Sequence, residues 1–477
     1  MPEILPLSVS EASQGAAVPR RSVLAAAGLL PLAAGARSAA PASDAPSTPS
    51  TPSPDVGSAV TVVRKPPAGP HCKPVLPRHG PARPFTGGSY AITYVPFEDV
   101  APPYLTLTES WNALGTDDQD RVYIVWTSTR DDGRGDAALF RYTHRTGARE
   151  FLGSFIDVAT RQGNIRPGEE IPKGHTRILQ VGRKLYLGSQ GFHDFKEGID
   201  DLPNYRGAHL FSYDLDTGAF DDVSRNLPGG VLLPHQGIVA LNHSPELGLL
   251  VGLAHPLGDI VLYDLRSGTV RKVVPGIPWA LNHVVSREIV VTRTGKVYTY
   301  RGPEDPSLHA ITDEVWEYDI AADRMRGTGQ FLEGGFWNGQ AVTRNRSTIY
   351  LSTVSGELYR LDVASGRFTH LGHFTDPVDY NDPAQYRVMY LYGIGLTVAE
   401  DALVGLPIIA PVAIDGDSAT RLTTYRIPTR RFTKHQDTDI QVFTGSNHRD
   451  RAGHLYQAAF DWDHNCHLAV ITPGRTG

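Results

Sequence analysis

Sulfur-containing residues are scarce in this chain of 477 residues, which has two cysteines and three methionines. It has no CxxC or HExxH motif, so the short patterns typical of zinc sites are absent. Basic residues do not exceed acidic ones (45 Lys and Arg against 51 Asp and Glu, net charge -6), which argues against a nucleic-acid-binding protein. An anionic partner would have to be bound by a local cluster of cations. No long amphipathic helix pattern is present either, which leaves strands as the main predicted structure.

A short pattern recurs along the chain: an aromatic residue or Leu, usually an Asp, and then a Thr-Gly or Ser-Gly turn. Copies lie at residues 142–147, 213–218 and 263–268, with weaker ones at 318–320, 361–366 and 425–427. Small antiparallel sheets that recur in this way are typical of β-propeller blades. Six such hairpins, with one more blade built from the two ends of the chain, predict an all-β protein: a seven-bladed β-propeller, with six or eight blades as alternatives. Radial repetition allows residues 85–477 to form one domain.

The second predicted blade carries two histidines at one edge. Residues 177–181 and 184–188 read as two strands joined at Gly182-Arg183. In such a hairpin the chain enters at His175 and leaves at His193, so we expect both histidines on one rim of the sheet.

Polar side chains recur at equivalent places in the other blades. In a propeller, the start of each innermost strand and the loop after the second strand converge on one mouth of the channel. The side chains at these positions are Trp111, Arg130, His175, His193, His235, His255, Asn282, His283, Arg301, Trp337, Asn338, Arg387, Tyr390 and Tyr392. This group predicts a pocket for an anionic ligand. A histidine at a strand start can equally be structural, which is the role that we expect for His209, His235 and His283 taken singly.

The N-terminal region predicts export. Pro19-Arg20-Arg21-Ser22 precedes a short Ala/Leu/Gly run, the pattern of a twin-arginine signal within residues 1–40, and that run is too short to span a bilayer comfortably. Residues 41–84 form a Pro-, Ser- and Thr-rich linker and N-terminal segment. Closure of the propeller by its two ends would bring Cys72 near Cys466, so a disulfide is one hypothesis in an oxidising compartment, and two unpaired thiols are the other. We expect a secreted monomer that binds neither membrane nor nucleic acid.

The predicted pocket suits elimination from a uronic acid. That reaction needs a clamp on the carboxylate, a base for the proton on C5 and an acid for the oxygen that leaves C4. Arg and Asn can supply the clamp, whereas His or Tyr can supply the base and the acid. In a glucuronate the proton and the leaving oxygen lie on the same side of the sugar ring, so one side chain can serve both.

Several short motifs resemble those of a known enzyme family. They are Gly174-His175-Thr176-Arg177, Gly191-Phe192-His193, Arg206-Gly207-Ala208-His209 and the Tyr-Asp-x-x-[Ser/Thr]-Gly hairpins. Together they resemble the seven-bladed propeller polysaccharide lyases. The chain is most similar to the L-rhamnose-α-1,4-D-glucuronate lyases, which act on the rhamnosyl-glucuronate caps of plant gum arabinogalactan. Ulvan lyases and oligogalacturonate lyases share the architecture and remain alternatives.

The resemblance implies roles for individual residues. It implies His175 and His193 as base and acid, and Arg301 and Asn338 as carboxylate clamps, in an acidic polysaccharide or oligosaccharide site that also includes His235, His255, Arg387 and Tyr390. It gives no complete metal-binding set and no cofactor site, so we predict neither a metal nor a cofactor.

Other classes of protein remain open. A propeller that binds sugars or proteins without catalysis would have the same scaffold. A glycoside hydrolase would need two carboxylates at the channel mouth, where Asp194 and Asp259 are the nearest. A cofactor-dependent oxidoreductase would need a cofactor site, for which the sequence gives no signal.

Overall fold

The computed structural model describes residues 85–87, 90–191, 204–277, 283–303, 312–374, 387–411, 419–438, 442–460 and 466–473. These residues belong to one compact unit. The expected signal and linker, residues 1–84, lie outside the described residues. No helix in the described part is both long and apolar enough to cross a bilayer.

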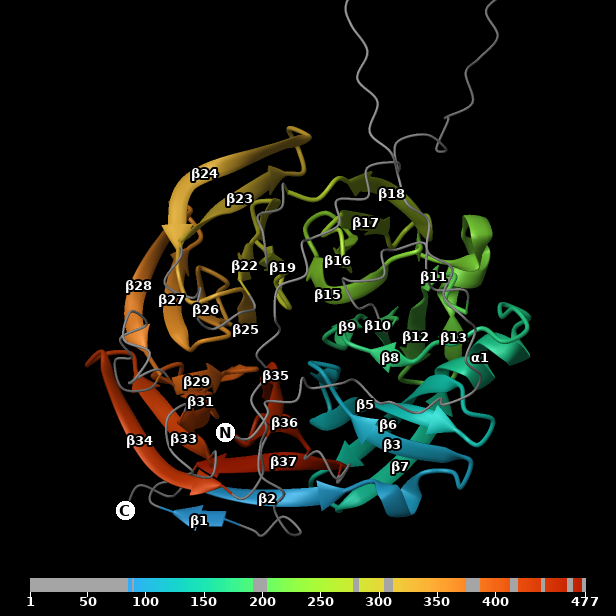
Figure 1. Ribbon diagram of the computed structural model, residues 1–477, viewed down its shortest axis with the longest axis horizontal. Helices are drawn as coiled ribbons and strands as arrows, with labels where there is room; N and C mark the ends of the chain where they lie inside the picture. Colours follow the sequence, from blue (N-terminus) through green and yellow to red (C-terminus); the bar gives the residue numbers. More distant parts are fainter. Residues whose placement is uncertain are drawn as a thin grey trace, which may run out of the picture. The chain divides into compact units, whose positions relative to one another are not determined.

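The described residues form a seven-bladed β-propeller, as the repeat pattern predicts (Figure 1). Each blade is an antiparallel sheet, and the innermost strands of successive blades contact each other around a common axis. Blade 1 consists of β3 (Leu105–Glu109), β4 (Leu114–Thr116), β5 (Arg121–Arg130), β6 (Gly135–Thr143) and β7 (Ala148–Ser154). Blade 2 consists of β8 (Lys173–Gly174), β9 (Leu179–Val181), β10 (Lys184–Gln190), β12 (Leu210–Asp214) and β13 (Phe220–Asp222). Blade 3 consists of β15 (Gly237–Ser244), β16 (Leu249–His255), β17 (Ile260–Asp264) and β18 (Thr269–Val274).

Blades 4 to 6 follow the same plan. Blade 4 consists of β19 (His283–Val285), β20 (Val290–Val291), β21 (Lys296–Thr299), β22 (Arg301–Pro303), β23 (Asp313–Asp319) and β24 (Arg324–Leu332). Blade 5 consists of β25 (Trp337–Val342), β26 (Thr348–Thr353), β27 (Glu357–Asp362) and β28 (Arg367–His373). Blade 6 consists of β29 (Arg387–Tyr390), β30 (Ile394–Leu396), β31 (Ala402–Gly405), β32 (Ile408–Pro411), β33 (Ala419–Arg426) and β34 (Arg431–Thr438).

Blade 7 is built from both ends of the described chain. It consists of β35 (Val442–Arg449), β36 (Leu455–Phe460), β37 (Cys466–Pro473), β2 (Tyr90–Pro96) and β1 (Phe85–Gly87). Strand β2 pairs along its whole length with β37, from Tyr90 opposite Pro473 to Pro96 opposite His467. The predicted closure by the two ends is therefore confirmed, because an N-terminal strand completes the C-terminal sheet.

Few elements lie outside the blades. They are the helix α1 (Phe155–Arg161), the 3-10 helices η1 (Glu98–Val100), η2 (Val223–Asn226) and η3 (Pro228–Gly230), and the short pair β11 (Gly207–Ala208) and β14 (Leu233–Pro234). Helix α1 begins where the Ser154 side chain accepts a hydrogen bond from the backbone N–H of Asp157.

The recurring turns have a local cause. In blade 2 the Asp214 carboxylate accepts hydrogen bonds from the backbone N–H groups of Asp216 and Thr217, and Gly218 follows at φ 72°. Blade 3 repeats this at Asp264 and Gly268 (φ 68°). A side chain that bonds its own backbone, followed by a residue free to adopt positive φ, closes a tight hairpin.

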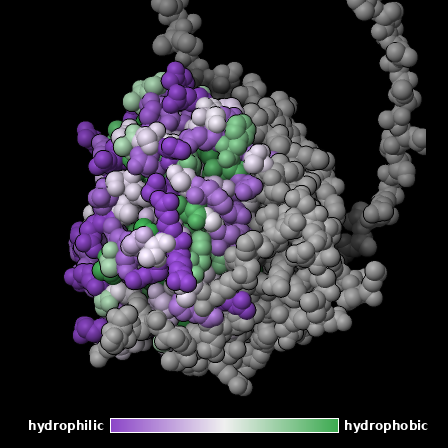
Figure 2. Space-filling view, turned by 90° about the vertical axis from the view of Figure 1, so that its left-hand side faces the viewer, coloured by the Kyte–Doolittle hydropathy of each residue, from purple (hydrophilic) through white to green (hydrophobic). Residues whose placement is uncertain are grey.

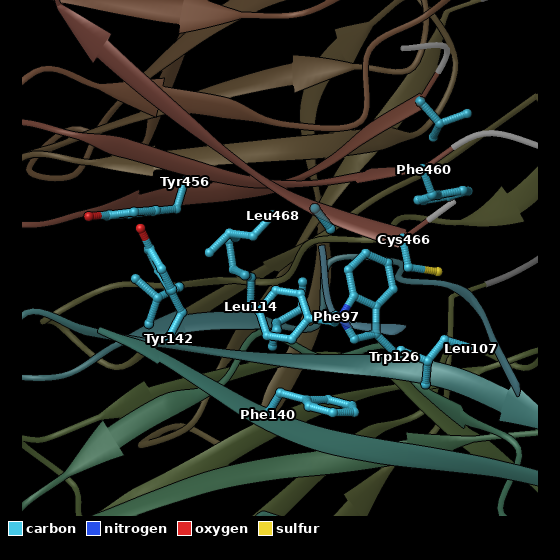
Figure 3. Packing of buried hydrophobic residues seen from close by; sticks show 14 of the residues in the cluster. Phe97, Leu107, Leu114, Trp126, Phe140, Tyr142, Tyr456, Phe460, Cys466 and Leu468 are labelled. Carbon is cyan, nitrogen blue, oxygen red and sulfur yellow. The ribbon is translucent and has the colours of Figure 1, made fainter. Parts of the chain in front are cut away.

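The two ends of the chain also meet in a hydrophobic core between blades 7 and 1. Phe97, directly after β2, lies 6.2 Å from Trp126 and 5.4 Å from Phe140 of blade 1, measured between ring centroids. Figure 3 shows these rings beside Leu468 of β37. Full burial of one such side chain stabilises a fold by about 1.5–3 kcal/mol, so this core fastens the closure.

Cys466 is buried at the start of β37. Its backbone N–H donates to Glu98 Oε1 at 2.5 Å. Cys72 lies outside the described residues, so the disulfide hypothesis stays a prediction.

The outer strands have a different surface. Figure 2 shows the side on which β24, β28 and β34 lie, where hydrophilic residues cover most of the coloured area. Along β24, exposed residues alternate with partly buried ones, because one face of an edge strand meets solvent. This alternation explains the hydrophilic surface.

Candidate functional site

The hairpin that organises blade 2 forms between β9 and β10, with Gly182 at φ 60° in the turn. The inner strand begins later than expected, at Leu179 instead of Arg177. The reason is that the backbone N–H of Ile178 donates to Leu114 O of blade 1, at 2.9 Å, in place of a partner in its own blade. Residues 175–178 thus lie between β8 and β9, in a break of the inner strand next to the axis.

His175 lies in this break and is buried, with 5% of its surface exposed. Its Nδ1 lies 3.1 Å from the carbonyl oxygen of Val239 in blade 3. A carbonyl can only accept, so Nδ1 donates and a neutral ring carries its lone pair on Nε2. Burial, and then the positive charges of Arg287 and Lys173, hold the pKa of His175 well below its ordinary value. His175 is therefore neutral at neutral pH.

The two cations beside His175 come from neighbouring segments. Lys173 forms an ion pair with Glu109 at 2.9 Å, and its Nζ lies 5.2 Å from the centroid of the Trp111 ring. Arg287 lies between β19 and β20, with its guanidinium carbon 5.5 Å from the Phe336 ring centroid. Both side chains are partly exposed. The site thus places two cations beside a neutral imidazole, an arrangement that suits an anionic ligand.

A buried polar network joins the inner strands across the axis. Arg177 Nη2 lies 3.0 and 3.1 Å from the two carboxylate oxygens of Glu288, and 3.4 Å from Gln340 O. Asn112 Nδ2 donates to Glu288 Oε1 at 3.4 Å. These residues belong to blades 1, 2, 4 and 5, so the Arg177–Glu288 pair and its two further contacts link four blades near the axis. Arg177 follows His175 by two residues and Glu288 follows Arg287 directly, so the pair joins the two segments that carry these side chains.

Asn338 is a buried residue of β25, with 4% of its surface exposed. Among the described residues its Nδ2 has no hydrogen-bond partner. The preceding Trp337 is held by stacking on Tyr300, with centroids 5.1 Å apart. Because buried amides nearly always have partners, this N–H group is available to a ligand.

Arg301, the clamp implied by the resemblance, is 3% exposed. Its Nη2 donates to the carbonyl oxygen of Pro256 at 3.4 Å and to that of Leu257. Arg301 thus contacts the backbone between β16 and β17 of blade 3. Arg130 is similarly engaged, with Asp136 at 2.7 Å and Asp157 at 3.0 Å.

The remaining predicted site residues have varied surroundings. His255 is buried at the end of β16, opposite Gly237 at the start of β15, so the two predicted positions of blade 3 do share one edge. His235 is exposed and has φ 60°. Tyr390 stacks on Tyr392 at 5.6 Å, and Tyr392 in turn contacts Trp111 edge-on at 5.2 Å.

Some predicted positions cannot be placed. His193, Asp194 and Asn282 lie outside the described residues, and so does the side chain of Arg387, the first residue of β29. Among the described residues, no group of three or more His, Cys, Asp or Glu side chains could hold a metal ion.

Two histidines have the surroundings of structural residues, as expected for them. His209 Nδ1 lies 2.7 Å from Asp222 Oδ2, and its Nε2 lies 3.4 Å from Glu169 Oε1. His283 Nδ1 lies 3.2 Å from Asp313 Oδ1. Asp259, one of the carboxylates considered for a hydrolase, accepts from Gln236 Nε2 at 2.7 Å and from the backbone of Gly276 at 2.8 Å.

Sequence reasoning missed Lys173, Arg287 and Glu288 as members of the site. No local motif marks them, and Glu288 meets Arg177 across a separation of 111 residues. The signal that could have found them is an alignment of the blades, because these residues lie near the starts of inner strands.

Comparisons with known proteins concern the fold. No protein-family model matches the chain, and no curated protein matches it. Among solved structures, the β-propeller domain of Myceliophteria thermophila Cps50 (Swd1) is similar at 10% identity and TM-score 0.48, over 82% of this chain and 99% of that one. The RRP9 WD40 repeats give 10% identity and TM-score 0.49, over 80% and 97%. U3-55K gives 9% identity and TM-score 0.48, over 80% and 98%, so these similarities are limited to the propeller architecture.

Proposed function

We propose that this propeller is a secreted polysaccharide lyase that cleaves the bond at C4 of a uronic acid, with rhamnosyl-α-1,4-glucuronate as the preferred substrate. The observation that carries the proposal is the state of His175: a neutral imidazole whose Nδ1 donates to Val239 O, beside the cations Arg287 and Lys173. A base must be unprotonated before it acts, and nearby cations favour both that state and the binding of a carboxylate.

The reaction then proceeds by elimination. Nε2 of His175 takes the proton from C5, and the electrons of that C–H bond form the double bond between C4 and C5. The C4–O bond breaks, and the departing oxygen receives a proton, either from His193, as the resemblance implies, or from the imidazolium that has just formed. Cations at the carboxylate stabilise the negative charge that develops before the C4–O bond breaks. With a terminal rhamnosyl-glucuronate the products are free rhamnose, whose C1 oxygen carries the new proton, and a chain that ends in an unsaturated uronate.

The test is ultraviolet absorbance of the unsaturated uronate while purified protein is incubated with gum arabic, ulvan or oligogalacturonate. We expect a rise with one substrate, gum arabic first, and a loss of about 10²–10⁴-fold in rate for His175→Ala and for His193→Ala. His370→Ala serves as the matched control, because His370 lies on the outer strand β28 with its side chain 47% exposed. A flat trace for the wild-type protein on all three substrates would contradict the proposal.

A second candidate is a propeller that binds acidic sugars or proteins without catalysis. One observation favours it: Arg301, the cation that the resemblance assigns to the substrate, donates instead to backbone carbonyls. This candidate predicts that the protein binds one of the three polymers by calorimetry, that absorbance stays flat, and that His175→Ala changes affinity alone.

A further inference from the structure

Arg287 has a backbone that is fixed from two sides. Its N–H donates to Trp337 O of blade 5 at 2.8 Å, and its carbonyl oxygen accepts from Asn112 Nδ2 of blade 1 at 3.5 Å. The next residue, Glu288, is held by Arg177 of blade 2. The side chain, in contrast, is partly exposed. A partly exposed cation on a backbone that is fixed in this way is well placed to meet a charged ligand.

Asn338 lies next to this point. The same hydrogen bond that fixes Arg287 joins it to Trp337, the residue before Asn338, so the backbone segments that carry Arg287 and Asn338 are neighbours at the junction of blades 4 and 5. Asn338 is buried and its Nδ2 has no partner among the described residues. A carboxylate accepts several hydrogen bonds, and an amide N–H beside a guanidinium is a suitable pair of donors for one.

Arg301 has contacts of a different kind. It is almost fully buried, and it donates to the carbonyls of Pro256 and Leu257. A Cβ placed on Gly258 would lie 2.5 Å from Arg301 Nη2, so the backbone between β16 and β17 packs directly on the guanidinium. These contacts bind blade 4 to blade 3.

We propose that Arg287 and Asn338 form the carboxylate-binding pair of the site beside His175, and that Arg301 holds the connection between β16 and β17. This inference rests on the proposed function for the identity of the ligand, a uronate. It assigns the substrate cation to a residue for which the sequence gives no motif.

The experiment compares recognition of a carboxylate with recognition of the same sugar without one. Acidic oligosaccharides from gum arabic, ulvan and oligogalacturonate are titrated calorimetrically against their carboxyl-reduced forms, with all variants made in a His175→Ala background so that no turnover occurs. We expect Arg287→Gln to lose about 10–100-fold in affinity for the acidic form and to bind the reduced form unchanged. Asn338→Ala loses less, because a neutral donor is removed, and Arg287→Lys retains part of the preference because it keeps the charge.

Arg301→Lys is the matched control. We expect it to lower the urea midpoint and to leave the preference for the acidic form intact. The inference is overturned if Arg287→Gln keeps the full preference, or if Arg301→Lys alone abolishes it in a protein whose circular dichroism is unchanged. Arg287→Gln could lose the preference for the acidic form while the protein that retains His175 shows no elimination. That result would uphold the carboxylate-binding pair and overturn the proposed lyase activity. No binding of any acidic oligosaccharide would overturn both.

Discussion

Blade 2 contains two buried histidines in opposite electrostatic surroundings. His175, at the axis, has cations as its charged neighbours, and burial together with Arg287 and Lys173 lowers its pKa. His209, on the outer half of the same sheet, lies between two carboxylates. Burial alone would lower its pKa, but the hydrogen bonds and charges of Asp222 and Glu169 outweigh burial and raise it. Burial of one residue type thus accompanies a lowered pKa in one place and a raised pKa in the other, according to the charges around it.

His209 and His175 also differ in the partners of their ring nitrogens. All polar atoms of His209 are bound within the blade, and Arg206 completes the network by contacting Glu169 at 2.9 Å. His175 uses Nδ1 for the carbonyl of Val239, and in the proposed reaction its Nε2 is the base. A histidine bound on both nitrogens by carboxylates has the surroundings of a structural residue, whereas one held neutral beside cations has the protonation state that a base needs.

The largest effect should come from breaking the outer network. Asp222→Ala removes the partner of His209 and also the oxygen atoms that accept from Asn164 and from the backbone of Ser224. We expect a loss of about 3–5 kcal/mol in the free energy of unfolding, because buried polar and charged groups lose their partner. Urea unfolding followed by fluorescence measures it. The exposed Asp216→Ala of the same blade is the control, and equal midpoints for the two variants would contradict this account.

The fold could be predicted from the sequence to a large extent, because its signals are local. The Asp214 and Asp264 turns, the Gly182 hairpin and the strand that closes blade 7 all depend on residues close in sequence or at the chain ends. The site could be predicted only in part. His175 and Asn338 lie near the starts of inner strands, where the alignment of the blades predicts them. Arg287 and the Arg177–Glu288 pair depend on contacts between blades, which no local sequence pattern encodes.

The pH dependence of stability should have opposite signs for the two histidines. The pKa of His175 is lower in the folded chain than the ordinary 6.5, so the unfolded state binds more protons and stability falls as the pH drops below 6.5. We expect this slope to reach about 1.4 kcal/mol per pH unit. His175→Gln should remove the part of this slope that is due to His175 between pH 6.5 and 5.5. The part due to buried His448, whose pKa is also lowered, should remain.

His209 should behave in the reverse manner. Because its folded pKa is raised, its contribution is fully present below pH 6.5 and is lost as the pH rises through the folded pKa. His209→Gln should therefore flatten the alkaline side of the stability profile and leave the acidic side as it is. Urea titrations at half-unit pH intervals measure both variants, and flattening on the same side in both would show that the two surroundings are not opposite.

A smaller effect concerns the proposed activity. Arg287 is the first charged neighbour among the causes that lower the pKa of His175, and Lys173 is the second. Removal of the Arg287 charge should let that pKa rise, so the acidic limb of kcat/KM should move to higher pH by about one unit or less. Initial rates of Arg287→Gln and Arg287→Lys across pH 4.5–8 measure this. The acidic limb should move in Arg287→Gln and stay in place in Arg287→Lys. A movement of equal size in both variants would mean that the shape of the side chain, and not its charge, sets the pKa of His175.

The smallest effect should come from an exposed pair that also joins two blades. Arg183, in the hairpin turn of blade 2, lies 2.9 Å from Asp118 of blade 1 and 2.9 Å from Asp216. Its geometry resembles that of the Arg177–Glu288 pair, but water surrounds it, and exposed charges gain little from pairing. We expect Arg183→Ala to leave the urea midpoint unchanged, while Glu288→Ala lowers it. If both variants lowered the urea midpoint equally, burial would not distinguish ion pairs at the axis from those at the rim. The contrast between His175 and His209 would then lose its physical basis.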